Sequence, residues 1–257
     1  MGGTDTTRFK LQKMWYKDFF TDIALEFWEK SHDTQMTKDE VAFLHQLFRL
    51  PKGARLLDML CGYGRHAIAM ARKGYVITGV DIAQLYISQL EEQAKRYRLP
   101  IDTLNADLSC VQLLHKYSGA YCLGNSISYF DRSGTVNLLK NVGQHLQPNS
   151  LLVLHTGMLA ESILPNLVLR DWQQAGELFF LMEHEHNMEL GRLDTQLTFI
   201  KDGKTEKRTI YHYIYTYAEM GNLLDQCGFK LLTAYANPDC EPFAFGDEQA
   251  YLVAQKI

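Results

Sequence analysis

A short apolar segment that runs into two glycines is the feature that most constrains the fold of this chain. Residues 55–60 (RLLDML) have the composition of a buried strand, Gly62-Tyr63-Gly64 follows, and a helical pattern begins directly after it and runs to Lys73. Glycines at the carboxyl end of a strand let a ligand approach the backbone, and the free N–H groups at the start of the helix favour polar or anionic groups. The segment therefore predicts the first strand–turn–helix unit of a ligand-binding α/β sheet.

Strand-like and helix-like patterns alternate along the middle of the chain. Further strands are predicted at residues 75–80, 101–104, 119–123 and 151–155, with helices at 83–97 and 131–145. Alternation of this kind predicts a parallel sheet with right-handed crossovers. A helix at 218–227 and strands at 229–234 and 250–255 then predict a closing hairpin at one edge of the sheet.

Two parts of the chain depart from this alternation. Residues 1–50 contain helical patterns at 11–29 and 39–49, and we predict that they form an N-terminal helical cap on a domain at 51–257. Within that domain, the segments that alternate with period two are 177–189, 192–201 and 208–216, and the last two are joined across the hairpin signal Asp202-Gly203. They predict an antiparallel three-stranded β insert within 158–217, on the substrate side of the domain.

Composition and charge exclude several classes of protein. The chain has 257 residues, 46% of them apolar, and a net charge of −4 from 26 basic and 30 acidic residues. This is the composition of a globular protein, without the positive charge of proteins that bind nucleic-acid phosphates. The apolar runs are too short to cross a bilayer, and the first residues lack the apolar core of a signal peptide. Five cysteines without a Cys-x-x-Cys pair indicate reduced thiols. We therefore predict a cytoplasmic protein, monomer or homodimer, with no nucleic-acid or membrane partner.

Two acidic residues follow the second and third predicted strands. Asp81 lies 19 residues after Gly62, where a carboxylate can accept hydrogen bonds from both hydroxyls of an adenosine ribose. Asp107 is placed to meet the exocyclic amine of an adenine. Residues 62–67 also satisfy the looser dinucleotide pattern G-x-G-x-x-A. Asp58 inside the first strand, the second acid and the terminal hairpin favour S-adenosylmethionine over a dinucleotide, and an NAD(P)-dependent oxidoreductase stays the less favoured alternative.

With these features in place, nearly the whole chain resembles the class I S-adenosylmethionine-dependent methyltransferases, in the small-molecule branch whose first motif reads LD-x-x-CGYGRHA. The other matching pieces are Trp15-Tyr16 and residues 79–82, 105–108, 125–130, 170–172, 215–219, 227–229 and 242–243. The resemblance implies a Rossmann-like α/β fold, with a seven-stranded sheet whose last strand is antiparallel. It also implies S-adenosylmethionine as cofactor and S-adenosylhomocysteine as product.

The resemblance assigns part of the cofactor to the glycine motif and the acid after the second strand. Gly62 and Gly64 are expected under the methionine part of the cofactor, with Tyr63 between them. Asp81 is expected to hold the ribose.

It assigns the remaining cofactor contacts to residues near the other strand ends. Ile82 is expected to pack on the adenine, and Asp107 and Leu108 to bind its edge. Asn125 is expected near the methyl group, and Tyr16 belongs to an N-terminal helix that closes over the cofactor in this family.

The predicted reaction is an in-line transfer of the methyl group to a nitrogen or oxygen of a small-molecule acceptor. His155, at the end of the fifth predicted strand, is the first candidate for a base, and Tyr129 is the second. Each has a structural alternative, which is a hydrogen bond to the neighbouring backbone for His155 and packing under the next helix for Tyr129. A protein that binds S-adenosylmethionine without catalysis is the main alternative to an enzyme.

The predicted acceptor site lies in the insert. Arg170 and Trp172 could bind an acidic acceptor or fix the loop. Tyr213 and Tyr215 belong to an alternating tyrosine stripe at residues 211, 213, 215 and 217, which could line a pocket or pack across strands. The chain departs from the family at Ser118, His155 and Tyr213, so the nature of the acceptor stays open. His184 and His186 have no third ligand at a usable spacing, and no metal is predicted.

Overall fold

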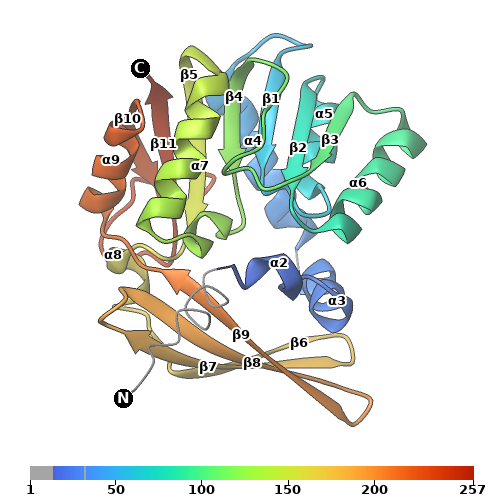
Figure 1. Cartoon of the computed structure of the whole chain (residues 1–257), viewed down its shortest axis with the longest axis vertical. Coiled ribbons are helices and arrows are strands. Elements are labelled where there is room, and N and C mark those ends of the chain that lie inside the picture. The colour runs from blue at the N-terminus through green and yellow to red at the C-terminus, as the bar shows by residue number, and fades with distance from the viewer. Residues whose placement is uncertain (1–13, 32) are drawn as a thin grey trace, which may run out of the picture.

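A seven-stranded sheet forms the upper part of the computed structural model, which describes residues 14–31 and 33–257 (Figure 1). Its strands are β1 (Arg55–Met59), β2 (Val76–Asp81), β3 (Ile101–Asn105), β4 (Tyr117–Cys122), β5 (Leu146–Thr156), β10 (Phe229–Tyr235) and β11 (Ala250–Lys256). They lie in the order β10-β11-β5-β4-β1-β2-β3, and β11 is antiparallel to both of its neighbours. The predicted parallel sheet with a closing hairpin at one edge is confirmed.

Helices cover both faces of this sheet, and each face has its own core. The helices are α4 (Thr34–Phe48), α5 (Arg65–Arg72), α6 (Gln84–Tyr97), α7 (Arg132–His145) and α9 (Tyr217–Gln226). One core joins Leu56 of β1 to α4, α5 and α6, and the other joins Leu57 and Met59 to α7 and α9. Because both faces are buried at the centre of the sheet, β1, β2 and β4 are almost entirely buried, whereas the edge strands β3 and β10 are partly exposed.

A second sheet contains four antiparallel strands, one more than predicted. They are β6 (Arg170–Ala175), β7 (Leu178–Asn187), β8 (Arg192–Lys201) and β9 (Lys204–Tyr213), in that order. The hairpin across Asp202-Gly203 is confirmed, and both residues have positive φ, at 51° and 70°. Strand β6 was not predicted, because this edge strand is exposed along most of its length and has no alternating apolar pattern.

The N-terminal segment is more broken than the predicted helix at 11–29. Residues 11–13 lie outside the described ranges, and the rest forms α2 (Tyr16–Phe19) and α3 (Asp22–Ser31), separated at Phe20-Thr21. Helix α4 begins before the predicted residue 39, because the Asp33 side chain accepts a hydrogen bond from the Gln35 N–H and caps it. In Figure 1, α2 and α3 lie between the two sheets.

The tyrosine stripe ends sooner than its sequence pattern suggests. Strand β9 stops at Tyr213, and Thr216 caps helix α9 with a capping box that includes Glu219. Tyr217 is therefore the first helical residue and does not continue the strand face. No helix in the described part of the chain is long and apolar enough to span a membrane.

Aromatic contacts attach α3 to the four-stranded sheet. The rings of Phe27 and Phe180 stack at 4.1 Å, and Phe199 packs beside Phe180 at 5.0 Å. Lys201 Nζ and Glu26 Oε2 add an ion pair of 2.7 Å between β8 and α3. Through these contacts, helix α3 packs on the second sheet.

Phe180→Ala is expected to lower the free energy of unfolding by about 3–5 kcal/mol, because it removes a buried ring and leaves a cavity. Phe179 is the matched control, since its side chain points to the opposite face and is 40% exposed, against 3% for Phe180. We expect Phe179→Ala to cost less than about 1 kcal/mol. Chemical denaturation of the two variants measures the difference, and equal losses would contradict the packing of α3 on this sheet.

Candidate active site

A pocket lies at the carboxyl ends of β1, β2, β3 and β4, under helices α2 and α3. It has an empty volume of about 870 Å³, including the space at its mouth. Seven of the nine predicted cofactor residues line it: Tyr16, Gly62, Tyr63, Asp81, Ile82, Asp107 and Leu108. The topology brings them together because parallel strands end at the same edge of the sheet.

The two glycines of the loop have different structural roles. Gly62 lines the pocket with a φ of 55°, and a Cβ there would meet only Tyr86 Cδ2 at 3.9 Å. Gly64 has a φ of 81° and precedes α5, and a Cβ there would lie 2.3 Å from Leu90 Cδ1 of α6. Gly64 is therefore required by close packing against α6, and it does not line the pocket, where it was expected.

Asp81 ties the glycine loop to the end of β2. Its Oδ2 accepts the Gly62 N–H at 2.8 Å, and its Oδ1 accepts the Ala83 N–H at 2.9 Å. Burial raises the pKa of Asp81, and these backbone hydrogen bonds oppose the rise. A carboxylate offers about four acceptor positions, so Asp81 can still accept hydroxyl hydrogen bonds.

Asp107 occupies the same pocket after β3. Its Oδ1 accepts from the N–H and the hydroxyl of Ser109, at 3.0 and 2.6 Å. Its Oδ2 lies 3.7 Å from Lys17 Nζ of α2. Asp107 therefore connects the sheet edge to the helix that covers the pocket.

Asp58 is a buried acid in the same pocket with an unused oxygen. Within the described ranges no donor makes a hydrogen bond of ordinary geometry to its Oδ2 in the pocket wall, although the buried Tyr121 hydroxyl is near enough to oppose the rise of its pKa. Burial raises the pKa of Asp58 to about 8. A buried polar atom without a partner is rare in a folded protein, and here it is available to a donor from a bound ligand.

These residues fit S-adenosylmethionine. Asp81 is available to the ribose hydroxyls, Ile82 and Leu108 offer apolar surface to the adenine, and Asp58 Oδ2 is available to a hydrogen bond from the ligand. The pocket thus combines apolar walls with acids at separate positions, as a nucleoside joined to an amino acid requires.

Aromatic side chains form the side of the pocket that faces the second sheet. The rings of Tyr16 and Tyr129 stack at 6.2 Å, and Trp15 contacts Tyr129 at 4.7 Å. Behind them, His212 of β9 contacts Tyr129 at 5.4 Å. Burial raises the pKa of Tyr16 to about 12 and raises that of Tyr129 further above its ordinary value, so both phenols stay protonated at neutral pH. Tyr129 therefore lies in the pocket, but as a neutral phenol and not as a ready base.

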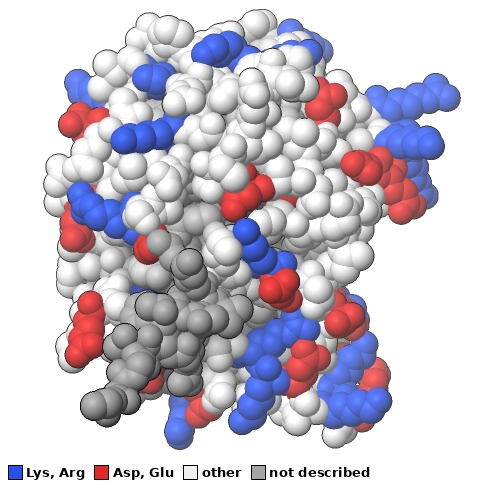
Figure 2. Space-filling view, in the orientation of Figure 1, with Lys and Arg blue, Asp and Glu red and all other residues white. Residues whose placement is uncertain are grey.

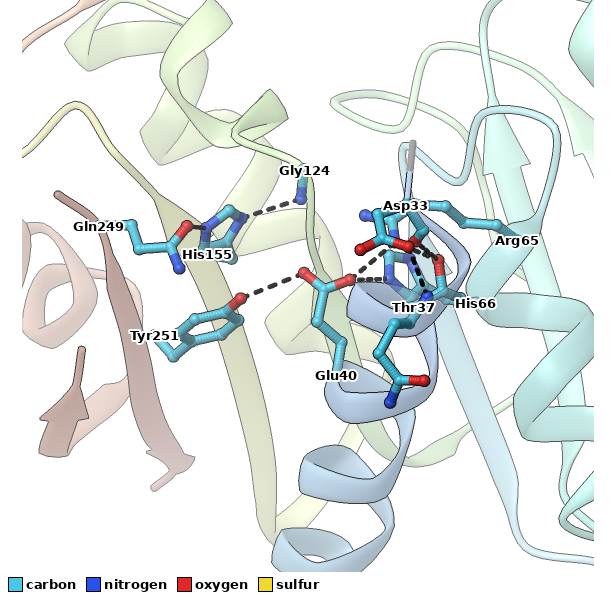
Figure 3. Close-up of polar contacts among 10 residues, drawn as sticks. Asp33, Thr37, Glu40, Arg65, His66, Gly124, His155, Gln249 and Tyr251 are labelled. Atoms are coloured by element: carbon cyan, nitrogen blue, oxygen red, sulfur yellow. Dashed lines mark hydrogen bonds and ion pairs between the residues drawn. The ribbon is translucent and has the colours of Figure 1, made fainter. Parts of the chain in front are cut away.

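His155 does not line the pocket, and Figure 3 shows it between Gly124 and Gln249. Its Nδ1 accepts the Gly124 N–H at 3.1 Å, and its Nε2 is 2.9 Å from Gln249 Oε1. The ring also stacks on Tyr251 at 4.5 Å. With both nitrogens in use, His155 holds Gly124, which does line the pocket, and the geometry gives no support to its predicted role as a base.

Asn125 is also outside the pocket lining. It has a φ of 68°, and its Oδ1 accepts from Thr156 Oγ1 at 2.8 Å and from the Gly157 N–H at 3.1 Å. Its neighbours Gly124 and Ser126 line the pocket. The amide thus fixes the loop after β4, and its side chain is not directed to the cofactor as expected.

The four predicted acceptor residues do not reach this pocket. Arg170 is 82% exposed at the start of β6 and pairs with Glu183, and Trp172 is 61% exposed on the same strand. Tyr213 is half-buried at the end of β9. The Tyr215 hydroxyl donates to the Phe130 carbonyl at 3.1 Å, so Tyr215 supports a residue of the pocket wall from behind.

The His184–His186 pair is not part of a metal site in the described residues. His184 Nδ1 is hydrogen-bonded to Thr195 Oγ1 at 2.8 Å. The described ranges hold no group of three or more His, Cys, Asp or Glu side chains arranged for a metal ion.

Several residues of the site were not predicted from the sequence. Arg65 and His66 line the pocket directly after the glycine loop, so their position in the motif was a usable signal. Glu40, whose carboxylate contacts both, is completely buried in α4. Its only signal is an acid at helical spacing from the buried Leu44 on an otherwise apolar face.

Asp58→Asn is expected to change how stability depends on pH. The folded protein holds the Asp58 proton up to about pH 8, against an ordinary pKa of 3.8. The wild type should therefore lose stability relative to the variant as pH rises through this window, with a slope approaching about 1.4 kcal/mol per pH unit. Denaturation curves between pH 5 and 8.5 measure this difference, with Asp102→Asn on the exposed face of β3 as control. Parallel curves for wild type and Asp58→Asn would show that Asp58 does not titrate there.

Proteins with methyltransferase domains are similar to this chain in sequence. Residues 56–149 match the family described as a methyltransferase domain. The putative methyltransferase YqeM of Bacillus subtilis (strain 168) is 24% identical over 215 residues, which cover 80% of this chain and 86% of that protein.

Solved structures share the fold. The CcbJ methyltransferase of Streptomyces caelestis superposes with a TM-score of 0.77 at 14% identity, over 89% of this chain and 98% of that one. CalS10 of Micromonospora echinaspora, an amino pentose methyltransferase solved with bound S-adenosylmethionine, gives a TM-score of 0.69 at 16% identity, over 93% and 99%. The matched domain, the sheet order and the pocket all indicate the same class of enzyme. The chain is an S-adenosylmethionine-dependent methyltransferase with the Rossmann-like class I fold.

Proposed function

We propose that the protein methylates a nitrogen or oxygen of a small-molecule acceptor. The observation that carries this proposal is the division of the pocket into two sides. Asp58, Asp81 and Asp107 lie in or after the first three strands of the sheet, whereas Tyr16 comes from α2 and stacks on Tyr129, which follows β4. The acidic side suits the cofactor, and the aromatic side is left for the acceptor.

The N-terminal helices and the second sheet are proposed to form the acceptor side. Trp15 Nε1 donates to the Tyr211 carbonyl of β9 at 3.0 Å, and His212 contacts Tyr129 in the pocket wall. The four-stranded sheet thus supports the aromatic side from outside. The predicted contacts through Arg170 and Trp172 are not carried forward, because both side chains are exposed away from the pocket.

The bound cofactor supplies an electrophilic methyl group on a sulfonium. The protein's part is to hold the acceptor in line and to exclude water, and orientation of this kind can account for most of the rate. Faces of Tyr16 and Tyr129 can attract the sulfonium, by about 0.5–2 kcal/mol. Since Tyr129 is protonated and His155 is engaged, we propose that an amine acceptor arrives neutral or an oxygen acceptor already acidic.

Two further observations support a small acceptor. CalS10, which shares the fold, is an amino pentose methyltransferase. In Figure 2, basic and acidic side chains are interspersed over the face in view, which does not suit a nucleic-acid backbone.

Transfer of labelled methyl from S-adenosylmethionine to a panel of amino sugars, other amines, phenols and carboxylic acids tests the proposal. We expect label on an amine or an acidic hydroxyl. Asp81→Ala is the control, and it should weaken S-adenosylhomocysteine binding at least about tenfold, because hydrogen bonds to a charged group contribute about 1.5–3 kcal/mol. Tight binding of S-adenosylhomocysteine with no transfer to any member would favour a non-catalytic binding protein, and transfer to RNA or protein alone would refute the small acceptor.

His155→Gln is expected to lower thermal stability and kcat while leaving the shape of the kcat–pH profile unchanged. The reason is that His155 acts on the pocket by holding the Gly124 N–H, and burial lowers its own pKa. Steady-state rates between pH 5.5 and 9 with the best acceptor provide the measurement. Loss of the acidic limb of the profile in the variant would instead identify His155 as the base.

A further inference from the structure

His66 differs from His155 in having only one ring nitrogen in use. Its Nε2 lies 2.7 Å from Glu40 Oε2. In the described part of the chain, Nδ1 has no hydrogen-bond partner and is not fully enclosed by protein atoms. The side chain is 6% exposed and lines the pocket. Nδ1 is therefore the nitrogen that a ligand in the pocket can use.

Glu40 decides which nitrogen of His66 carries the hydrogen. The carboxylate is completely buried and also accepts from Arg65 Nη1 at 2.7 Å and from the Tyr251 hydroxyl at 3.2 Å (Figure 3). Burial opposes ionisation, but His66 and Arg65 outweigh it and lower the pKa of Glu40 to about 2. Because an ionised carboxylate can only accept, Nε2 must carry a hydrogen, and Nδ1 of the neutral ring is left as an acceptor.

The His66 ring lies on the β4 side of the pocket. It meets the Tyr121 ring of β4 edge to face at 6.4 Å. The acids proposed to bind the adenosine, Asp81 and Asp107, follow β2 and β3, which lie beyond β1 in the strand order. Tyr129, on the aromatic side proposed for the acceptor, follows β4. His66 is thus placed toward the acceptor and away from the adenosine.

The surroundings of His66 keep its ring neutral at physiological pH. The titratable groups that face it are Glu40 of α4, Arg65 of α5, Tyr121 of β4 and His155 of β5. Burial, Arg65 and His155 lower the pKa of His66 below its ordinary value of 6.5, against the opposing effect of Glu40. Burial also keeps Tyr121 protonated and uncharged. Nδ1 is therefore free to take a proton, and Glu40 would stabilise the imidazolium that results.

We propose that His66 Nδ1 accepts the proton that an amine acceptor loses on methylation, and that Glu40 is a positioning residue for His66. The inference rests on the proposed function and narrows its acceptor to an amine that arrives neutral. The nitrogen lone pair forms the bond to the methyl carbon, the carbon–sulfur bond breaks with its electrons left on sulfur, and the N–H proton passes to Nδ1. The imidazolium, paired with Glu40, returns this proton to solvent after the product leaves.

His66→Gln removes the free nitrogen and keeps the bond to Glu40, because the amide N–H of Gln can take the place of Nε2–H. With an amine that the wild type methylates, we expect kcat to fall about 10²- to 10⁴-fold. The acidic limb of the kcat–pH profile, below the ordinary histidine pKa of 6.5, should disappear. Calorimetric affinity for S-adenosylhomocysteine should change less than about threefold, which also shows that the variant is folded. An unchanged rate and profile, or a loss confined to S-adenosylhomocysteine affinity, would overturn the role of His66.

His45→Gln is the matched control. His45 Nδ1 is hydrogen-bonded to the Tyr75 hydroxyl at 2.8 Å and does not line the pocket. Both kcat and the pH profile should therefore stay at the wild-type values.

The positioning role of Glu40 is tested by two variants with opposite effects. Glu40→Gln removes the charge, so the pKa of His66 should fall further and the acidic limb should move to lower pH. Tyr251→Phe removes a donor from Glu40 and should move the limb to higher pH, because the carboxylate then acts more strongly on the imidazole. Tyr251→Phe keeps the buried ring and decides the question if Glu40→Gln fails to fold. A limb that does not move would show that Glu40 has only a structural role.

Imidazole ¹⁵N NMR of the histidine-labelled protein tests the tautomer without any acceptor, with His66→Gln to assign the signals. We expect a hydrogen on Nε2 and none on Nδ1 at neutral pH, and the reverse would overturn the inference. Methylation of oxygen acceptors alone would overturn the inference and leave the proposed function standing. No transfer to any small acceptor would refute the proposed function, and the inference with it.

Discussion

Burial of both faces of the seven-stranded sheet is the constraint on which the rest of this molecule depends. With α4, α5 and α6 on one face and α7 and α9 on the other, ligands can reach the sheet only where its strands end. The functional groups are therefore collected at one edge, after β1, β2, β3 and β4. The bond from the Gly62 N–H to Asp81 fixes that edge by joining the first two strand ends.

The site contains several buried acidic side chains. Asp58 and Asp81 are buried in the pocket wall, where burial raises the pKa of each. Glu40 lies one layer behind and is kept ionised by His66 and Arg65. These groups differ in how far the protein satisfies them, since Glu40 is fully paired and Asp58 is not. A residue that binds a ligand must keep some hydrogen-bonding capacity free in the pocket. A residue that supports it from behind must have its own polar groups fully paired.

The second sheet acts on the site indirectly. Its strands support α3 through Phe27 and Phe180, and β9 supports the aromatic side of the pocket through His212 and the Tyr211 carbonyl. Its exposed residues Arg170 and Trp172 take no part in the pocket. The sequence alone could not distinguish the strand residues that support the pocket from the exposed ones, because the exposure of a strand residue depends on what packs against its face of the sheet.

The sequence by itself determined the sheet, its closing hairpin and the acids that line the pocket. Apolar runs of strand length, the glycine loop and Asp81 are local features, and local patterns are read directly from the chain. Tertiary structure alone decided that Gly64 serves packing against Leu90, that His155 has both nitrogens engaged and that Asn125 turns toward Thr156. It also placed Glu40 of α4 behind Arg65 of the glycine loop. Each of these depends on partners many residues away, and the direction of a side chain is set by those partners and not by its neighbours in sequence.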